Sequence, residues 1–219
     1  MITFEQIRDN AEIRAYIEKG NANLGVLGFT EHSLGHAGKA AATAGNILLQ
    51  LGHPAREAEL ARIAGYMHDL GNCINRADHA HTGALMAMSI LSRLGMEPAE
   101  AAVVMAAIGN HDEKTGTAVD AVSAALILAD KSDVRRSRVR GRDRSRFDIH
   151  DRVNFAAKGS QLEVDAVARE ITLNIELDDE ICSVLDYFEI FLERMLMCRR
   201  AAERLGCTFR LTANGSKVL

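Results

Sequence analysis

The sequence is poor in aromatic residues and in proline. Only 5% of its 219 residues are aromatic, none is tryptophan, and two are proline. Because proline interrupts helices, its scarcity favours long uninterrupted helices. Hydrophobic residues nevertheless make up 47% of the chain. This is enough for a core of Ala, Leu, Ile, Val and Met in one large domain, or in one domain with a small appendage.

The sequence also lacks long apolar runs and paired cysteines. No stretch of about eighteen apolar residues occurs, and the first twenty residues are charged, which predicts neither a membrane span nor a signal peptide. The four cysteines show no CxxC spacing and are predicted to be reduced thiols. A net charge of −4 argues against general binding of nucleic acid or membranes. We therefore expect a cytoplasmic protein.

Apolar residues recur at three- and four-residue steps through the first 130 residues. This spacing is typical of amphipathic helices. It predicts a helix over residues 4–19, a Gly- and Asn-containing loop to residue 28, and helices over 33–51, about 60–71, about 83–95, 98–110 and about 119–130.

The last quarter of the chain changes period. Apolar residues alternate with polar ones over 171–177 and again over 207–212, which predicts two half-buried strands. Between them, residues 178–205 have acids at the start and arginines near the end, as suits a helix dipole. The fold class expected is mainly α, with a helical domain over 1–160 and an α+β appendage over 161–219. Since two strands alone are marginally stable, we expect a homodimer formed through this appendage.

The dipeptide His-Asp occurs three times, at His68–Asp69, His111–Asp112 and His150–Asp151, so the dipeptide alone indicates little. The first pair differs because it ends an apolar helix. Burying an imidazole and a carboxylate there is costly unless they are paired or bound to a metal. His36 lies on the preceding predicted helix and Asp130 ends a later one. Three converging helices would make a metal site of the helix-bundle kind.

The order His36, His68-Asp69, Asp130 resembles the HD superfamily of metal-dependent phosphohydrolases. The flanking motifs agree over about residues 30–140: Met67-His-Asp-Leu-Gly71, His79-Ala-His-Thr-Gly83-Ala84, Ile108-Gly-Asn-His111-Asp-Glu113 and Leu128-Ala-Asp130-Lys131-Ser-Asp133. No Gly-Tyr-Pro follows His111, so the chain does not resemble the HD-GYP branch, which cleaves cyclic di-GMP.

The resemblance implies a ligand set. It implies that His36, His68, Asp69 and Asp130 bind a divalent metal ion, one of Mn, Fe, Co, Ni, Zn or Mg. It also implies that His79 and His111 hold a second metal or contact the substrate phosphate, so that each chain binds one or two ions. His32 competes with His36 for its place, and His81 competes with His79. The alanines after His36 and the spacing from His79 to Gly83-Ala84 favour the ligands named first.

The expected function is hydrolysis of a small phosphate ester, such as a nucleotide, by a metal-activated water. Asp69 is expected to ligate the metal and orient that water, and Lys131 or nearby arginines are expected to hold the phosphate. Two alternatives use the same ligands: a mixed-valent di-iron oxygenase of the HD fold, and a non-catalytic HD protein that senses a ligand.

A basic stretch follows Asp130. Residues 131–152 hold nine of the 26 basic residues. Arginines beside a metal suit a phosphate, which they bind by paired hydrogen bonds. If the helix continues past Asp130, Arg135, Arg136 and Arg138 would reach that phosphate. A further run with little helical pattern is expected to be a solvated loop: Arg140, Arg142, Arg144 and Arg146.

Overall fold

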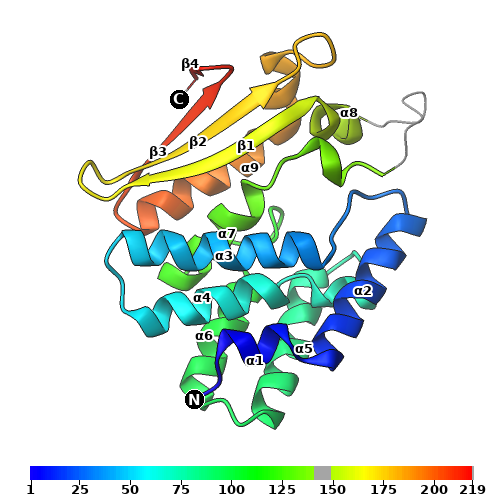
Figure 1. Ribbon diagram of the computed structural model, residues 1–219, viewed down its shortest axis with the longest axis vertical. Coiled ribbons are helices and arrows are strands. Elements are labelled where there is room, and N and C mark those ends of the chain that lie inside the picture. The colour runs from blue at the N-terminus through cyan, green and yellow to red at the C-terminus, as the bar shows by residue number, and fades with distance from the viewer. Residues whose placement is uncertain (141–148, 219) are drawn as a thin grey trace.

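The computed structural model describes residues 1–140 and 149–218. A body of helices carries a small sheet at one end (Figure 1), which confirms the mainly α fold with an α+β C-terminal part. The helices are α1 (Phe4–Arg8), α2 (Ala11–Val26), α3 (Leu34–Gln50), α4 (Ala55–Met67), α5 (His79–Arg93), α6 (Pro98–Gly109), α7 (Ala121–Lys131), α8 (Ile149–Ala156) and α9 (Val184–Arg204), with short 3-10 helices η1 (Leu70–Cys73) and η2 (Arg136–Arg138). The strands are β1 (Ala157–Asp165), β2 (Glu170–Leu177), β3 (Thr208–Ala213) and β4 (Ser216–Lys217).

The first predicted helix is wrong in its extent. The chain forms two helices there, because the side chain of Asn10 accepts from the backbone N–H groups of Glu12 and Ile13 and starts α2. Helix α2 then continues to Val26, through residues predicted to form a loop. The side chain of Asn23 donates to the carbonyls of Asn72 and Cys73 at 3.3 and 2.9 Å. Contacts with η1 therefore outweigh the low helix propensity of this segment.

Helices α3 and α4 run side by side through the middle of the body (Figure 1). Ser33 caps α3, which begins within one residue of its predicted start. The face of α3 toward α4 is built from small residues such as Ala37 and Ala41, which are buried. A Cβ atom on Gly65 of α4 would lie 2.7 Å from Cα of Ala41. The two backbones are therefore in contact, and this close approach brings the His36 and His68 side chains together.

The remaining core helices differ from their predicted bounds mainly at one end. Helix α5 begins at His79, four residues before the predicted start. Helix α6 begins with Pro98 at its first turn, as predicted. Helix α7 is opened by a capping box of Asp120 and Ser123 and ends at Lys131. The helix thus ends one residue after Asp130, and the longer helix on which the expected reach of Arg135, Arg136 and Arg138 depended does not form.

The sheet has the order β1-β2-β3-β4, with β2 and β3 parallel and the outer pairs antiparallel. The predicted strand–helix–strand unit is β2, α9 and β3, and the apolar side chains of β2 and β3 are buried. Helix α9 begins at Val184, later than predicted, because Ser183 and Asp186 form its capping box. Strands β1 and β4 were not predicted. Most of β1 after Ala157 is exposed or half-buried, since it is an edge strand.

Helix α9 joins the sheet to the helical body. It contacts β3 on one side and α7 on the other, and one continuous apolar core runs through both parts. Strand β1 spans the expected boundary at residues 160 and 161; the division into two domains and the homodimer stay predictions. Among residues 1–140 and 149–218, no helix is long and apolar enough to cross a membrane.

The contact between α3 and α4 gives a stability prediction. Gly65→Ala should lower the free energy of unfolding by about 1–3 kcal/mol, because the added methyl group overpacks against the Ala41 backbone. Gly38→Ala is the matched control. A Cβ atom at Gly38 meets nothing within 4 Å, so this variant should gain about 0.5–1 kcal/mol from helix propensity. Urea denaturation followed by circular dichroism measures both, and equal effects would contradict the close packing.

Candidate metal centre

Six side chains from five parts of the chain converge where the ends of α4, α6 and α7 meet the starts of α3 and α5. The structure brings together all six residues that the sequence predicts as ligands: His36, His68, Asp69, His79, His111 and Asp130. Five of them are buried, and the side chain of Asp130 is 12% exposed. Helix ends deliver most of these groups, so turns rather than helix faces set their positions.

One group gathers around the Nε2 atoms of His36 and His68, which are 3.3 Å apart. Asp130 Oδ1 lies 3.3 Å from the first and 3.6 Å from the second. Asp69 Oδ2 lies 3.1 Å from His68 Nε2 and 3.7 Å from His36 Nε2. Four donor atoms from three helices and a turn thus face a common point.

A second group lies on the other side of Asp69. The Nε2 atoms of His79 and His111 are 3.2 Å apart. Asp69 Oδ1 is 3.7 Å from His79 Nε2 and 4.0 Å from His111 Nε2. Asp69 therefore presents one carboxylate oxygen to each group.

The other ring nitrogen of each of three histidines contacts a backbone carbonyl. His68 Nδ1 is 2.8 Å from Gly65 O, His79 Nδ1 is 3.1 Å from Arg76 O, and His111 Nδ1 is 2.6 Å from Ile108 O. A carbonyl oxygen only accepts, so Nδ1 donates in each case and carries the proton. In the neutral ring the Nε2 lone pair then points into the centre, which is the form that ligates a metal.

The carboxylate of Asp133, for which the sequence predicted no role, orients the His36 ring. Its Nδ1 lies 2.8 Å from Oδ2 of Asp133, and both side chains are buried. A carboxylate that accepts from a metal-binding histidine fixes the ring and makes it a stronger donor. In the sequence, this carboxylate could have been found as the acidic residue three positions after Asp130, at the end of the same motif.

The charges of the centre favour a bound cation. Burial would raise the pKa of Asp69, yet the neighbouring His68 and the other imidazoles hold it well below its usual range. Burial would lower the pKa of His68, but the adjacent carboxylates Asp69 and Asp130 raise it to about 10. Among the described residues, buried Asp69 Oδ2 has no hydrogen-bond partner. A divalent metal ion would satisfy this oxygen, and the imidazole and carboxylate donors fit such an ion.

The pKa values of the two histidines of the second group shift in the opposite direction to that of His68. Burial lowers the pKa of both His79 and His111, and the charge of Lys131 contributes at His111. Both rings are therefore neutral near pH 7, and their lone pairs are available to a ligand.

The two alternative histidines lie outside both groups. His32 is half-buried beside the centre, with its ring centroid 5.5 Å from that of His36 and its Nδ1 at 2.8 Å from Thr30 O. His81 is exposed and contacts Asp78 at 2.5 Å. The placement of His36 and His79 thus agrees with the preference drawn from the sequence.

Lys131 lies at the edge of the centre. Its Nζ is 2.8 Å from Asp130 Oδ2 and 3.7 Å from Glu113 Oε1. Arg194 of α9 contacts the same Glu113 oxygen at 2.7 Å. A chain of alternating charges therefore links the C-terminal part to Asp130, and Lys131 is buried within it.

The arginines expected to hold a phosphate have other partners. Arg135 contacts Asp133 at 2.7 Å, Arg136 binds Phe155 O and Asp178, and Arg138 binds Glu31 O and Asp133 O. Their expected approach to the metal required a helix that continues past Asp130, but α7 ends at Lys131. These contacts therefore do not support a role of the three arginines in substrate binding.

The predicted solvated loop starts too early. Arg140 binds the carbonyls of Phe29 and Asn21 and the Asn21 side chain, which contradicts its assignment to that loop. The rest of the predicted loop, Arg142, Arg144 and Arg146, lies outside the described residues.

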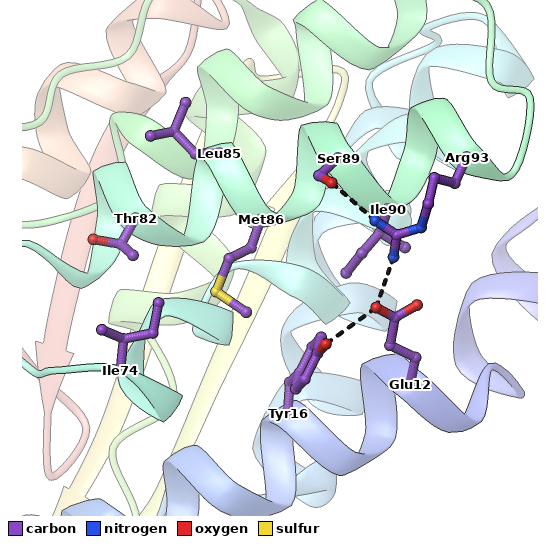
Figure 2. Close-up of a pocket in the computed structure, with 9 residues that line it drawn as sticks. All are labelled: Glu12, Tyr16, Ile74, Thr82, Leu85, Met86, Ser89, Ile90 and Arg93. Carbon is purple, nitrogen blue, oxygen red and sulfur yellow. Dashed lines mark hydrogen bonds and ion pairs between the residues drawn. The ribbon is translucent and has the colours of Figure 1, made fainter.

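A cleft between α2 and α5 is separate from this centre. It has a volume of about 360 Å³, and Figure 2 shows its apolar lining with Met86 and Ile90 beside a polar edge. At that edge Glu12 contacts Arg93 at 2.6 Å and Tyr16 at 3.1 Å. None of the six converging residues lines this cleft.

Comparison with known proteins finds one family. The sequence profile of the HD domain matches residues 29–189. No curated protein matches the chain. Among solved structures, a predicted HD superfamily hydrolase from an uncultured Thermotogales bacterium is 24% identical over 56% of this chain and 67% of that chain, with a TM-score of 0.44.

The contact between His36 and Asp133 gives a prediction about metal affinity. Asp133→Asn should weaken binding of a divalent transition metal by about ten- to a hundredfold, because the ring loses the carboxylate that orients it. Asp120→Asn, the same change at the N-cap of α7, is the control, since asparagine also caps helices. Titration with a metal indicator measures both. If the two variants bind metal equally, Asp133 does not position His36.

Proposed function

Because the chain belongs to the HD domain family, we propose that it is a metal-dependent phosphohydrolase that acts on a phosphate ester. The matched region, residues 29–189, contains all six converging residues. HD domains bind divalent metals. The observation that carries the proposal is the convergence of imidazole lone pairs and carboxylates, because such groups repel one another unless a cation lies between them.

We propose that the centre holds two cations. His36, His68 and Asp130 would bind one, His79 and His111 would bind the other, and Asp69 would serve both through its two oxygens. The separate contacts of Oδ1 and Oδ2 support this assignment. All donors are nitrogen or oxygen, which suits Mn, Fe, Co, Ni, Zn or Mg.

When bound, a divalent cation supplies a hydroxide nucleophile near neutral pH and polarises the phosphoryl group. The protein's own residues prepare the site for this chemistry. Asn72 donates to Asp69 Oδ1 at 2.7 Å and fixes the orientation of this carboxylate. Lys131 brings a positive charge beside Asp130, which would offset negative charge that develops on the phosphoryl oxygens.

Two cations per chain can be tested by composition. The purified protein, supplemented with a divalent transition metal and desalted, should contain about two equivalents by elemental analysis. His79→Ala should retain about one equivalent, whereas His81→Ala should match the parent because His81 is exposed and lies outside both groups. A parent protein with less than a tenth of an equivalent would contradict metal binding altogether.

Asp69 tests the reaction itself. Asp69→Asn should reduce hydrolysis of a generic phosphate ester such as p-nitrophenyl phosphate by at least about a thousandfold, or about 4 kcal/mol in transition-state stabilisation. Helical content should persist. Asp78→Asn is the matched control, because Asp78 has a left-handed backbone (φ 60°) that asparagine tolerates.

Phosphate release and oxygen consumption should be followed in the same samples, with several divalent metals. Oxygen uptake without phosphate release would favour a di-iron oxygenase. Metal binding with neither reaction, over a broad panel of phosphate esters, would favour a ligand-sensing protein.

A further inference from the structure

Arg76 lies at the edge of the metal centre and keeps hydrogen-bond donors available. Its Nη1 is 3.9 Å from Asp69 Oδ1, beyond hydrogen-bond distance, and donates to Asn72 Oδ1 at 3.3 Å. In the part of the chain that the structure describes, no carboxylate lies closer to this guanidinium. The side chain is 32% exposed, so it faces both the centre and solvent.

The other cations around the centre are already engaged. These cations are Lys39, Lys131, Arg135, Arg138 and Arg194. A nitrogen of each side chain lies 2.7–2.8 Å from an oxygen of the protein. An incoming anion would have to share each of these cations with an oxygen of the protein. Arg76 can bind one without losing an ion pair of normal length.

An aromatic ring accompanies this arginine. The Cζ atom of Arg76 lies 5.8 Å from the centroid of Phe29, and Phe29 is 43% exposed. A partly exposed aromatic ring therefore lies close to a charged group at the site. Aromatic rings and guanidinium planes both stack on planar ligands.

Although Phe29 is exposed, its backbone is held in place. Gly28 has φ +83° and ends α2, and Phe29 N donates to Leu24 O at 2.9 Å in the turn that follows. Arg140 Nε donates to Phe29 O at 2.9 Å. The ring thus projects from an ordered turn, as a binding residue requires.

The basic stretch holds the loop that contains Phe29. Glu31 N donates to Arg138 O at 2.7 Å, and Arg138 Nε donates to Glu31 O at 2.8 Å. Together with Arg140, these bonds fix residues 29–31 and so hold the Phe29 ring near Arg76. Arg138 and Arg140 are therefore positioning residues for this loop.

We propose that Arg76 and Phe29 form the substrate-recognition surface of the metal centre, where Arg76 binds the phosphoryl oxygens and Phe29 packs against a planar aromatic group of the ester. The inference rests on the proposed function and narrows its substrate class to phosphate esters with an aromatic ring or a nucleobase. A phosphoryl group bound by Arg76 beside Asp69 would lie close to Phe29, whose ring centroid is 5.8 Å from the guanidinium carbon. Paired guanidinium hydrogen bonds suit such an oxyanion.

Binding of two phosphonates tests this surface without depending on catalysis, because their carbon–phosphorus bond is not hydrolysed as an ester is. Phenylphosphonate and methylphosphonate share the oxyanion and differ in the ring. Their affinities for the metal-supplemented protein can be measured by titration calorimetry. The parent should prefer phenylphosphonate by about tenfold, the effect expected for one stacked ring.

The variants separate the two contacts. Arg76→Ala should weaken both phosphonates by about tenfold or more, with Arg76→Lys in between. Phe29→Ala should remove the preference for the phenyl compound and leave methylphosphonate unchanged. Arg93→Ala is the control, since Arg93 lies in the separate cleft and pairs with Glu12 (Figure 2); it should bind as the parent does.

Several results would overturn the proposal. They are equal affinity of the parent for both phosphonates, no binding of either by metal-loaded protein, and unchanged affinity in Arg76→Ala. A fall in metal content in Arg76→Ala would instead show that Arg76 positions Asp69 through Asn72. Normal phosphonate binding without hydrolysis of any ester would contradict the proposed function and leave this recognition surface in place.

Discussion

The structure depends on one electrostatic constraint, the meeting of several electron-rich donor atoms in a buried space. Backbone carbonyls fix the protons of His68, His79 and His111 on Nδ1, so three lone pairs point at the carboxylate of Asp69. Without a positive charge this arrangement is strongly unfavourable in a medium of low dielectric constant. The pKa of His68 is raised for the same reason: the ring is buried, but Asp69 and Asp130 lie beside it and favour its protonated, positively charged form. A proton on His68 can compensate part of this unfavourable interaction, and divalent metal ions can compensate it at all of the donor atoms together.

The helical body is arranged to maintain this convergence. Gly65 and Ala41 let α3 and α4 approach until their backbones touch, and this contact sets the 3.3 Å separation of His36 and His68. Outside the donors, Asp133 and Lys131 hold His36 and Asp130 at their outer atoms. The centre is therefore fixed by small residues within the helices and by charges around it, and the aromatic-poor composition follows naturally. Large rings between α3 and α4 would keep the donors apart.

The sequence was sufficient to predict which six side chains come together and where most helices lie, because a single strong pattern marks each of them. Periodic apolar residues mark α3, α6 and α7, and the four histidine- and aspartate-containing motifs mark the centre. Features decided by tertiary contacts were missed. Helix α2 extends over a glycine- and asparagine-containing segment because Asn23 binds η1. Strand β1 has a weak apolar alternation because it lies at the edge of the sheet. The role of Asp133 depended on a turn after Lys131 that no pattern specified.

The charges of the chain illustrate why the substrate side was harder to predict than the metal side. Ligands must lie within a few ångströms of one ion, so their identities and order constrain them strongly. A phosphate-binding arginine can come from any helix, strand or loop from which its long side chain reaches the site. A run of arginines in the sequence does not show where their side chains point. In the structure, Arg138 and Arg140 turn toward backbone carbonyls of residues 29–31, and their charge is used to hold a loop. A single arginine outside that run, Arg76, faces Asp69. Local charge density in a sequence thus indicates where cations occur, whereas the availability of their donors is decided by the carbonyls and carboxylates that the fold places around them.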